Sequence, residues 1–307
     1  MEQTSTTTSS TAKRCAVVTG ANKGIGLEIC RQLASNGITV ILTARNEQMG
    51  IEAIENLEVS GFSDVVFHQL DVKDPVSIAS LAKFIETHFR KLDILVNNAG
   101  SGGLIMDSEA FRASKLGWGD VIDENANLLK KFMKQTYEAA EECLKTNYYG
   151  TRGVTEALLP LLQLSNSARI VNVSSIYGQL RLIYNEKVKA ELQDIEGLTE
   201  EKIDEILQWF LRDLKEDKLQ ANGWPVTVSA YKVSKAAINA YTRLIARKFP
   251  NFLVNCVHPG YINTDITCNM GNLTPEEGSK APVMLALLPD NGPSGFYFDE
   301  MNASTFS

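Results

Sequence analysis

Residues 19–26 have the sequence TGANKGIG and follow a short apolar run at 15–19. Helical periodicity begins at residue 25, so the glycines stand between a predicted strand and a predicted helix. Glycine permits a tight turn and a close approach of the backbone to a pyrophosphate, which the free N–H groups of a helix N-terminus attract. The spacing is GxxxGxG rather than GxGxxG, and its place after the first strand is what favours a dinucleotide site. The predicted cofactor contacts in this turn are Gly20, Asn22, Lys23, Gly24, Ile25 and Gly26.

The rest of the chain alternates short apolar runs with segments of helical periodicity. Predicted strands lie at 15–19, 39–43, 65–70, 94–97, 169–174 and 252–257, and predicted helices at 25–35, 48–57, 78–89, 143–164 and 230–248. Strands that are apolar throughout are typical of sheets covered on both faces. The order of elements therefore predicts the α/β class, with a Rossmann-type doubly wound parallel sheet, helices on both faces and a single domain over 13–307.

Two long connections, 101–142 and 176–230, interrupt this alternation as helical insertions. Connections of this length need structure of their own. In the second, Thr199 is predicted to cap a helix whose first turn holds two glutamates. The helix carries an apolar stripe of Ile203, Ile206, Leu207, Phe210 and Leu214. We expect this helix to pack on the parent domain rather than to bind a partner.

The first insertion is rich in large apolar side chains. These are Phe111, Trp118, Leu128, Leu129 and Phe132. Such a segment can form a lid over a pocket or decorate the surface of the domain, and the sequence favours neither interpretation over the other.

Composition excludes several classes of function. The 307-residue chain has a formal net charge of −7 and a pI near 5.2, which argues against a nucleic-acid or anionic-membrane binder. No apolar run is long enough to span a bilayer, so no membrane partner is expected. The polar N-terminus lacks an apolar signal core. We predict a disordered tail over 1–12, with a short chloroplast address as the alternative.

The cysteines and histidines point to neither disulfides nor a metal. The five cysteines are scattered, with no CxxC pair, which suits free thiols in the cytoplasm. Cys15 and Cys256 lie in apolar runs and are predicted to belong to the core. The three histidines lack metal-ligand spacing, so no metal site is expected. His258 precedes a Pro-Gly pair, and we interpret it as a packed or surface side chain rather than a site residue.

The end of the second predicted strand indicates which dinucleotide binds. NAD sites place a carboxylate there for the ribose 2′-hydroxyl, whereas this chain has Thr-Ala-Arg-Asn at 43–46. Arg45 can form a bidentate pair with a 2′-phosphate, and Lys23 adds a second positive charge. The alternative is two solvated cations. We therefore expect NADPH rather than NADH. The ends of the third and fourth predicted strands add Asp71, Val72 and Asn98 as contacts to the cofactor.

A phenol and an amine lie four residues apart at Tyr231 and Lys235. If the segment is helical, both side chains share one face. An ammonium beside a phenol favours the phenolate and lowers the phenol pKa from its usual value of about 10. A shift to near neutrality would take roughly 4 kcal/mol. A phenol tuned in this way can exchange a proton with an alcohol or ketone oxygen.

These segments together resemble the short-chain dehydrogenases/reductases from about residue 13 to residue 300. The matching motifs are TGANKGIG at 19–26, DV at 71–72, NNAG at 97–100, NVSS at 172–175, YKVSK at 231–235 and PGYINT at 259–264. The chain is most similar to carbonyl-reductase-like members with a long segment before the tyrosine. Among these it most resembles plant enzymes that reduce an alkaloid ketone, followed by reductases of menthone-type monoterpenoid ketones.

The resemblance implies a role for each of four residues. Tyr231 would be the general acid in reduction, and Lys235 would lower its pKa and hold the nicotinamide ribose. Ser175 would hydrogen-bond the carbonyl oxygen of the substrate and stabilise the developing alkoxide. Asn147 would hold a water that links Lys235 to solvent. Ser175 and Tyr231 would thus contact the substrate.

The resemblance further implies that three residues position the nicotinamide carboxamide, namely Pro259, Gly260 and Thr264. One departure stands out, because 56 positions separate Ser175 from Tyr231, more than is usual in the family. Many relatives dimerise through the helices around Asn147 and Tyr231. An inserted helix could cover that surface, so we expect a monomer.

The sequence therefore predicts an NADPH-dependent carbonyl reductase that converts a bulky ketone to a secondary alcohol. The resemblance implies an alkaloid ketone as the substrate, with a menthone-type ketone as the alternative. Two further hypotheses remain open. One is an NAD-dependent alcohol dehydrogenase, and the other is a non-catalytic NADPH-binding sensor.

Overall fold

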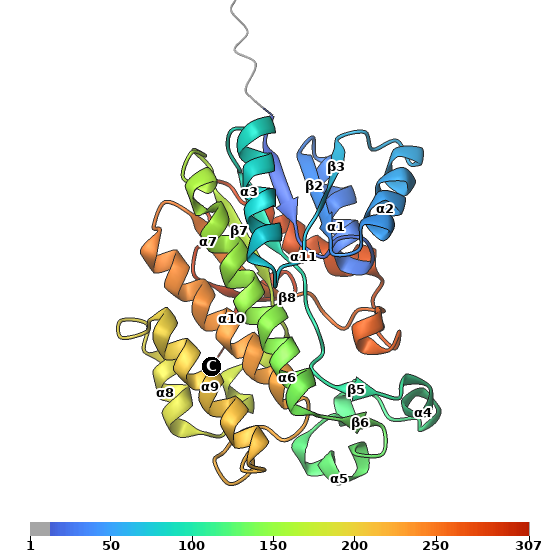
Figure 1. Ribbon diagram of the computed structural model, residues 1–307, viewed down its shortest axis with the longest axis vertical. Helices are drawn as coiled ribbons and strands as arrows, with labels where there is room; N and C mark the ends of the chain where they lie inside the picture. The colour runs from blue at the N-terminus through green and yellow to red at the C-terminus, as the bar shows by residue number, and fades with distance from the viewer. Residues whose placement is uncertain (1–12, 307) are drawn as a thin grey trace, which may run out of the picture.

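The computed structural model describes residues 13–306, and the predicted tail at 1–12 lies outside this range. Its centre is an eight-stranded sheet with the order β10-β9-β8-β7-β4-β1-β2-β3 (Figure 1). The strands are β1 (Cys15–Val18), β2 (Thr39–Ala44), β3 (Val65–Gln69), β4 (Ile94–Asn97), β7 (Arg169–Val173), β8 (Leu253–His258), β9 (Tyr297–Asp299) and β10 (Asn302–Ser304). All neighbours are parallel except β9 and β10. The predicted doubly wound sheet is confirmed.

The strand order reverses between β1 and β4. From β1 the chain builds outward through β2 and β3, and from β4 it builds the other way through β7 and β8. In register, Val17 of β1 lies between Ile41 of β2 and Leu95 of β4. Open α/β sheets bind ligands at such a switch point, beyond the carboxyl ends of the strands.

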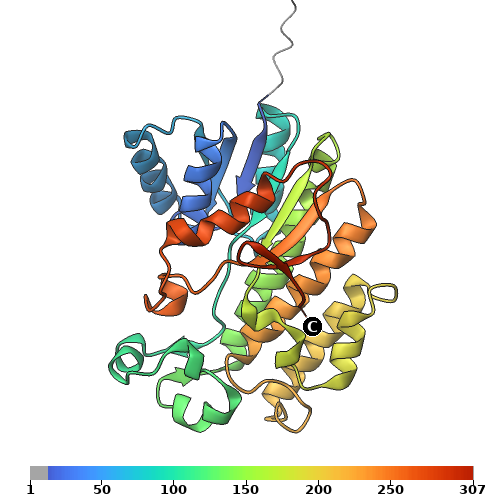
Figure 2. The ribbon, with the colours of Figure 1, turned by 180° about the vertical axis from the view of Figure 1, so that it is seen from behind.

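Helices cover both faces of the sheet, as predicted (Figures 1 and 2). One face carries α1 (Gly24–Ser35), α2 (Glu47–Val59) and α11 (Pro275–Ala286). The other face carries α3 (Pro75–His88), α6 (Tyr137–Leu144), α7 (Thr151–Leu162) and α10 (Ser229–Lys248). Strands buried on both faces explain why the strand segments are apolar throughout.

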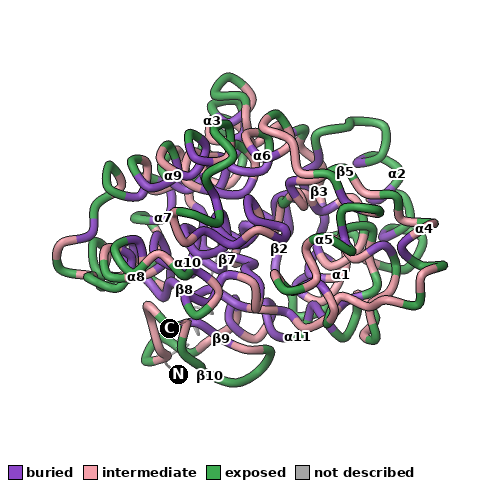
Figure 3. The backbone as a smooth tube through the Cα atoms, turned by 90° about the horizontal axis from the view of Figure 1, so that it is seen from below, coloured by how far each residue is buried: buried purple, intermediate pink, exposed green. Residues whose placement is uncertain are grey.

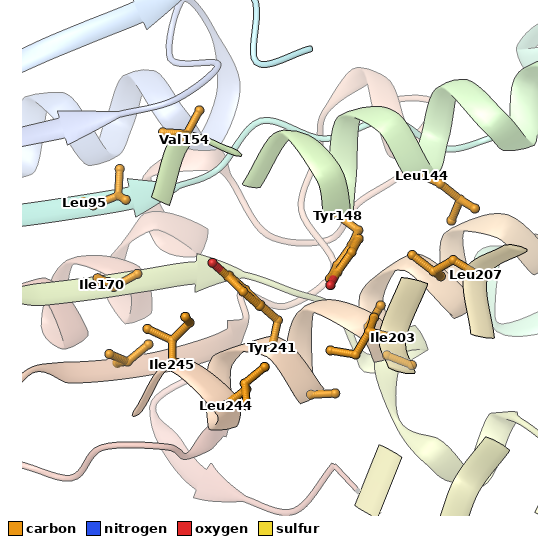
Figure 4. Packing of buried hydrophobic residues seen from close by; sticks show 14 of the residues in the cluster. Leu95, Leu144, Tyr148, Val154, Ile170, Ile203, Leu207, Tyr241, Leu244 and Ile245 are labelled. Atoms are coloured by element: carbon orange, nitrogen blue, oxygen red, sulfur yellow. The ribbon is translucent and has the colours of Figure 1, made fainter. Parts of the chain in front are cut away.

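The larger core cluster lies on the α10 side of the sheet. Tyr148 and Tyr241 are fully buried there, with ring centroids 6.0 Å apart in an edge-on arrangement. Leucine and isoleucine side chains from the sheet and from three helices surround them (Figure 4). The centre of the molecule is buried along the strands, and exposed backbone lies mainly at the periphery (Figure 3). Cys15 and Cys256 belong to this interior, as predicted.

The first insertion folds as a small unit of its own. Strand β5 (Ile105–Met106) pairs antiparallel with β6 (Met133–Lys134), and the short helices α4 (Ser108–Ala113) and α5 (Ala126–Leu129) lie between them. Its apolar side chains form a separate cluster of Phe111, Val121, Leu129, Met133 and Val228. Val228 comes from the segment just before α10, and Tyr231 of α10 and Met270 of the loop after β8 pack against the same cluster, so the insertion contacts the parent domain.

The second insertion contributes α8 (Glu186–Gln193) and α9 (Glu200–Lys215). Thr199 caps α9, since its hydroxyl accepts a hydrogen bond from the backbone N–H of Lys202 at 3.3 Å. Ile203 and Phe210 are fully buried on the face that packs against α6 and α10. The predicted helix and its packing on the parent domain are confirmed.

Several elements were not predicted, among them α8, α11, β9, β10 and the short helices and strands of the first insertion. Helix α11 contains Pro282 in its interior, which broke the helical pattern in the sequence. Strands β9 and β10 have only three residues each. The helix predicted at 143–164 is interrupted by a π-helical turn at Lys145–Gly150. Within residues 13–306 no helix is both long enough and apolar enough to cross a membrane.

Candidate active site at the carboxyl ends of the strands

The glycine-rich turn after β1 is held in a conformation that side chains would obstruct. Gly20 and Gly24 have φ values of +61° and +57°. A Cβ on Gly20 would lie 2.9 Å from the Cα of Ala99, and one on Gly26 would lie 2.5 Å from Nδ2 of Asn98. Lys23 precedes α1 with extended backbone and no side-chain cap, so no side chain satisfies the first N–H groups of the helix. Such a turn fits a pyrophosphate.

Asn98 supports the turn from β4. Its amide Nδ2 donates hydrogen bonds to the carbonyl oxygens of Thr19 at 2.9 Å and Gly20 at 3.0 Å. The Thr19 hydroxyl accepts from the backbone N–H groups of Asn98 and Ala99, both at 3.0 Å. The predicted cofactor contact Asn98 therefore uses its amide on the turn itself. Thr19 was not predicted as a site residue, although it is the first residue of the quoted motif.

Arg45 lies where the sequence placed it, directly after β2, with an exposed side chain. It lines a cavity of about 510 Å³ together with Gln69, Asp71, Asp74 and Ser77. Arg45 forms no salt bridge with any residue in the described range 13–306. A cation without a carboxylate partner is free to bind a phosphate.

Lys23 is engaged elsewhere than expected. Its ammonium forms an exposed salt bridge with Asp265, in the loop after β8. The predicted second cation for the 2′-phosphate is thus paired with a carboxylate in this structure. Asn22 is partly exposed, and Ile25 packs against the α1 core. Asp265 was not predicted, because nothing local in the sequence ties it to Lys23.

Asp71 and Val72 shape the end of β3. Asp71 accepts a hydrogen bond from the backbone N–H of Lys73 at 3.0 Å and faces the same cavity as Arg45. Val72 packs on the π-helical turn, where a Cβ on Gly150 would lie 2.8 Å from its Cγ2. These contacts bring the end of β3 next to the turn that carries Asn147.

Four predicted site residues come together beyond the ends of β4 and β7. Ser175 is the second residue after β7, and Tyr231 and Lys235 lie one turn apart on α10. The ammonium of Lys235 is 5.5 Å from the centroid of the Tyr231 ring. A Cβ on Gly100 would lie 3.6 Å from Oδ1 of Asn147 and 3.8 Å from Nζ of Lys235, so both side chains converge on the end of β4.

Asn147 is held by hydrogen bonds to Ser101, Ser234 and Cys143, the last from its Nδ2 to Sγ at 3.2 Å. Its Oδ1 accepts from the backbone N–H of Ser101 at 2.7 Å, and its Nδ2 donates to the Ser101 carbonyl at 3.0 Å and to the Ser234 hydroxyl at 2.9 Å. The residue sits in the π-helical turn, a distortion that is frequent at functional sites. Asn147 thus ties the β4 loop to α10 at the point where Lys235 lies.

The pKa shifts of Tyr231 and Lys235 differ from those expected from the sequence. Burial raises the pKa of Tyr231 above its ordinary value, and a hydrogen bond with Ser175 opposes that shift only in part. Burial lowers the pKa of Lys235 to about 8. The ammonium donates to the Val173 carbonyl at 2.8 Å. The prediction that Lys235 brings the Tyr231 pKa toward neutrality is therefore wrong for this structure, because desolvation penalises both charged forms.

A neutral Tyr231 still suits proton donation. A phenol whose pKa lies above 10 keeps its proton at physiological pH and can give it to an oxygen that becomes basic during reaction. Ser175 is placed to bond the same oxygen, since its hydroxyl is within hydrogen-bonding reach of Tyr231 and accepts only one backbone N–H, that of Tyr177, at 3.2 Å.

The loop after β8 closes the cofactor side of the site. Gly260 has a φ of +99°, and a Cβ on Gly24 would lie 3.4 Å from the Cγ2 of Thr264, so this loop approaches the glycine-rich turn. The Thr264 hydroxyl is buried and has no partner among the described residues. An orphaned buried hydroxyl is costly unless a ligand satisfies it. Pro259, Gly260 and Thr264 therefore fit the edge of a dinucleotide.

Tyr177 is a site residue that the sequence did not reveal. Its ring meets Tyr231 edge-on, with centroids 6.3 Å apart, and its hydroxyl donates to the Trp118 carbonyl at 2.9 Å. The only sequence signal was its place two residues after Ser175. Residues 13–306 contain no group of three or more histidine, cysteine or carboxylate side chains arranged to hold a metal ion.

Comparison with known proteins gives consistent matches. The family model described as short chain dehydrogenase matches residues 14–187. Salutaridine reductase of Papaver somniferum is 52% identical over 96% of this chain and 97% of that protein. A solved structure of that enzyme superimposes with a TM-score of 0.86, covering 94% of this chain and all of that one. (+)-Neomenthol dehydrogenase of Arabidopsis thaliana is 53% identical over 95% of this chain and 98% of that protein. Mouse carbonyl reductase [NADPH] 3 is 37% identical over 91% of this chain and 93% of that protein.

Proposed function

The chain belongs to the short-chain dehydrogenase family, and we propose that it is an NADPH-dependent reductase that converts a bulky ketone to a secondary alcohol. The observation that carries the proposal is the convergence of Ser175, Tyr231 and Lys235 at the carboxyl end of β7. A protein that only bound a dinucleotide would have no use for a buried proton donor beside the Ser175 hydroxyl.

Each side chain has a defined task in this proposal. Tyr231 donates its proton to the ketone oxygen, and Ser175 hydrogen-bonds the same oxygen while negative charge develops there. Lys235 bonds the ribose hydroxyls next to the proton donor. Asn147 holds the loop after β4 next to the turn of α10 that carries Lys235, through its hydrogen bonds to Ser101 and Ser234. When bound, NADPH supplies the hydride, and the protein supplies alignment.

The choice of NADPH over NADH rests on Arg45. No carboxylate stands at the end of β2, and the guanidinium is unpaired among the described residues and faces a cavity of about 510 Å³. We assign the 2′-phosphate to Arg45. Asp71 and Val72 are assigned to the adenine side of the cofactor. The turn at 19–26 is assigned to the pyrophosphate, and Pro259, Gly260 and Thr264 to the carboxamide.

For the substrate we propose salutaridine, reduced to salutaridinol in alkaloid biosynthesis. Salutaridine reductase is similar to the chain over nearly its whole length. The Tyr177 ring lies beside Tyr231, and the Trp118 ring lies beside Tyr177. The second candidate is a menthone-type monoterpenoid ketone, because (+)-neomenthol dehydrogenase is similar to the same extent. We also propose a cytoplasmic location, since all five cysteines are free thiols.

Following NADPH consumption with salutaridine, menthone and simple aromatic ketones tests the proposal. We expect turnover with salutaridine and little with the small ketones. Turnover with menthone alone would assign the second candidate. NADPH binding without reduction of any ketone would favour the cofactor-binding sensor. A faster reaction with NAD and an alcohol would favour the NAD-dependent alcohol dehydrogenase.

A further inference from the structure

The residue after Tyr231 carries a buried charge that is paired with the first insertion. Lys232 lies in the first turn of α10 with a side chain only 2% exposed, and its Nζ is 3.1 Å from Oδ1 of Asp123, which is 13% exposed. A buried ammonium is strongly destabilising unless it is paired and hydrogen-bonded. Asp123 therefore fixes the position at which the insertion meets the start of α10.

Asp123 also holds the backbone that leads into α10. Its carboxylate accepts from the N–H groups of Val226 at 3.0 Å and Thr227 at 2.9 Å, and from the Thr227 hydroxyl. Lys232 in turn donates to the Thr227 hydroxyl at 2.9 Å. Burial alone would raise the pKa of Asp123, but the hydrogen bond from Thr227 and the charge of Lys232 lower it, so the carboxylate is ionised. One carboxylate thus binds three residues just before and within the first turn.

The turn that Asp123 supports is strained. Val228 stands at the N-cap of α10 with a φ of +42° and a ψ of +39°, a region that β-branched residues avoid at a cost of about 1–3 kcal/mol. Gln135 of the first insertion secures the next residue, since its Oε1 accepts from the backbone N–H of Ser229 at 2.6 Å and from its hydroxyl at 2.7 Å. Such a backbone persists only where its surroundings enforce it, and both enforcing side chains come from the insertion.

Polar contacts carry much of this docking, because packing is incomplete. A cavity of about 880 Å³ lies between the two insertions, and Asp123, Gln135, Leu214 and Leu219 line it. Apolar contact is therefore interrupted on one side of the strained turn. On that side the ion pair and the Gln135 hydrogen bonds hold the start of α10, and they add to the apolar contacts that Val228 makes with the first insertion.

The same insertion reaches Tyr231 from a second direction. The carbonyl of Trp118 accepts from the Tyr177 hydroxyl at 2.9 Å. The Tyr177 ring contacts the Tyr231 ring edge-on, and the Lys232 ammonium is 5.8 Å from the Tyr177 centroid. Trp118 also donates from Nε1 to the Thr267 carbonyl at 2.9 Å, in the loop on the cofactor side. The insertion thus bridges the two walls of the site.

We propose that Asp123 is a positioning residue, which places the Tyr231 hydroxyl against the ketone oxygen by anchoring Lys232 and the strained turn before α10. The inference rests on the proposed function, since it concerns the placement of the proton donor. When Asp123 is lost, the first turn of α10 is free to shift. Lys235 keeps its own anchor on the Val173 carbonyl at 2.8 Å, so the cofactor site is retained.

Two substitutions test the proposal at saturating NADPH. Asp123→Asn removes the charge, and Lys232→Met removes the ammonium but keeps most of the side-chain volume. We expect kcat to fall about 10- to 100-fold in both, since a displacement of about 1 Å can cost that much, while the KM of the ketone and the Kd of NADPH change less than about threefold. Glu124→Gln is the matched control, because it neutralises the neighbouring carboxylate and leaves the contacts of Asp123 in place.

A solvent isotope effect separates positioning from stability. If the proton donor is misplaced, proton transfer limits turnover, and the effect of D₂O on kcat rises in both variants and not in Glu124→Gln. Thermal unfolding of each variant sets an assay temperature at which the protein stays folded. Should kcat and the isotope effect match the wild type there, although the melting temperature has fallen, Asp123 has a structural role only and the inference is overturned.

If Asp123→Asn does not fold, the Lys232→Met variant decides whether the inference holds. In that variant the Asp123 carboxylate is intact and keeps its hydrogen bonds from Val226 and Thr227. Tyr231→Phe separates this inference from the proposed function. An active Tyr231→Phe enzyme overturns the proposed function and the inference with it. An inactive Tyr231→Phe enzyme beside an unimpaired Asp123→Asn enzyme overturns the inference alone.

Discussion

The Asn98 side chain donates a hydrogen bond to the carbonyl oxygen of Gly20 at 3.0 Å. It thereby joins the end of β4 to the turn after β1, across the point where the strand order reverses. A Cβ on Gly26 would lie only 2.5 Å from Nδ2 of the same amide, which is too close for a side chain at that position. The cofactor turn is therefore supported from two strands. Gly26, which has no side chain, leaves room for the Asn98 amide that supports the turn.

We expect Gly26→Ala to weaken NADPH binding at least tenfold. The new methyl group must displace Asn98, and the loss of its two hydrogen bonds costs about 1 kcal/mol each. Fluorescence titration with NADPH measures the change. Gly37→Ala is the control, since Gly37 has a φ of +75° but a Cβ there would meet nothing within 4 Å. It should cost about 1 kcal/mol of stability and leave NADPH binding unchanged, and equal effects at both sites would contradict the assignment.

Arg45→Asp should change which dinucleotide the enzyme uses. A charge-assisted hydrogen bond to phosphate contributes about 1.5–3 kcal/mol, and the new carboxylate adds repulsion, so kcat/KM for NADPH should fall about 100-fold or more. The value for NADH should change less than about fivefold. Lys187→Asp on α8 makes the same change of charge far from β2 (Figure 1) and should affect neither. A parallel loss with both dinucleotides would show that Arg45 does not bind the 2′-phosphate.

The pKa of Lys235 predicts an alkaline limb in the pH profile. Burial lowers this pKa from 10.5 to about 8, so the unfolded chain holds the proton more tightly between these values. The cost of burying the ammonium is present in full below pH 8 and is relieved as the pH rises toward 10.5. If the ammonium is needed, kcat/KM for NADPH should fall above about pH 8, because this parameter reports the free enzyme.

Lys235→Arg provides the control for that profile. Arginine stays charged at every pH in the assay and can donate to the Val173 carbonyl, so the limb should disappear even if activity is lower. Tyr231 does not titrate in this range, because burial raises its pKa further. A limb that persists in Lys235→Arg belongs to another group.

A single chain should be the functional unit. Helix α9 packs its apolar face on α6 and α10 and so covers the surface through which, by the family resemblance, a dimer would form. Light scattering across a concentration series should therefore give a mass of 33.8 kDa. A mass twice that value, independent of dilution, would show that α9 leaves a dimer surface open.

Much of the fold followed from apolar runs in the sequence. Strand β4 has the predicted bounds, and α10 begins one residue earlier than predicted, because both carry strong local patterns. The short strands β9 and β10 escaped prediction, since three residues carry no periodicity and their pairing depends on the edge that β8 offers. The π-helical turn around Asn147 was also missed; its Gly150 packs closely on Val72, a tertiary contact that no local pattern shows.

Site chemistry was predictable where it depended on residue type and strand ends. Tyr231 and Lys235 were identified from their spacing and Ser175 from the family resemblance, and the structure brings the three together. The direction of the Tyr231 pKa shift was predicted wrongly, because the depth of burial is a property of the folded chain. The pairing of Lys23 with Asp265 was also missed, since the two residues are distant in sequence and meet only when the loop after β8 folds over the glycine-rich turn.

The most direct test of the account is ketone reduction by Tyr231→Phe. Phenylalanine keeps the ring that packs on Tyr177 and removes only the hydroxyl. We expect kcat to fall at least about 1,000-fold while the Kd of NADPH changes less than about threefold, because the proton donor is lost and the cofactor site is kept. Turnover near that of the wild type would contradict the assignment of Tyr231 as the acid and, with it, the proposed mechanism.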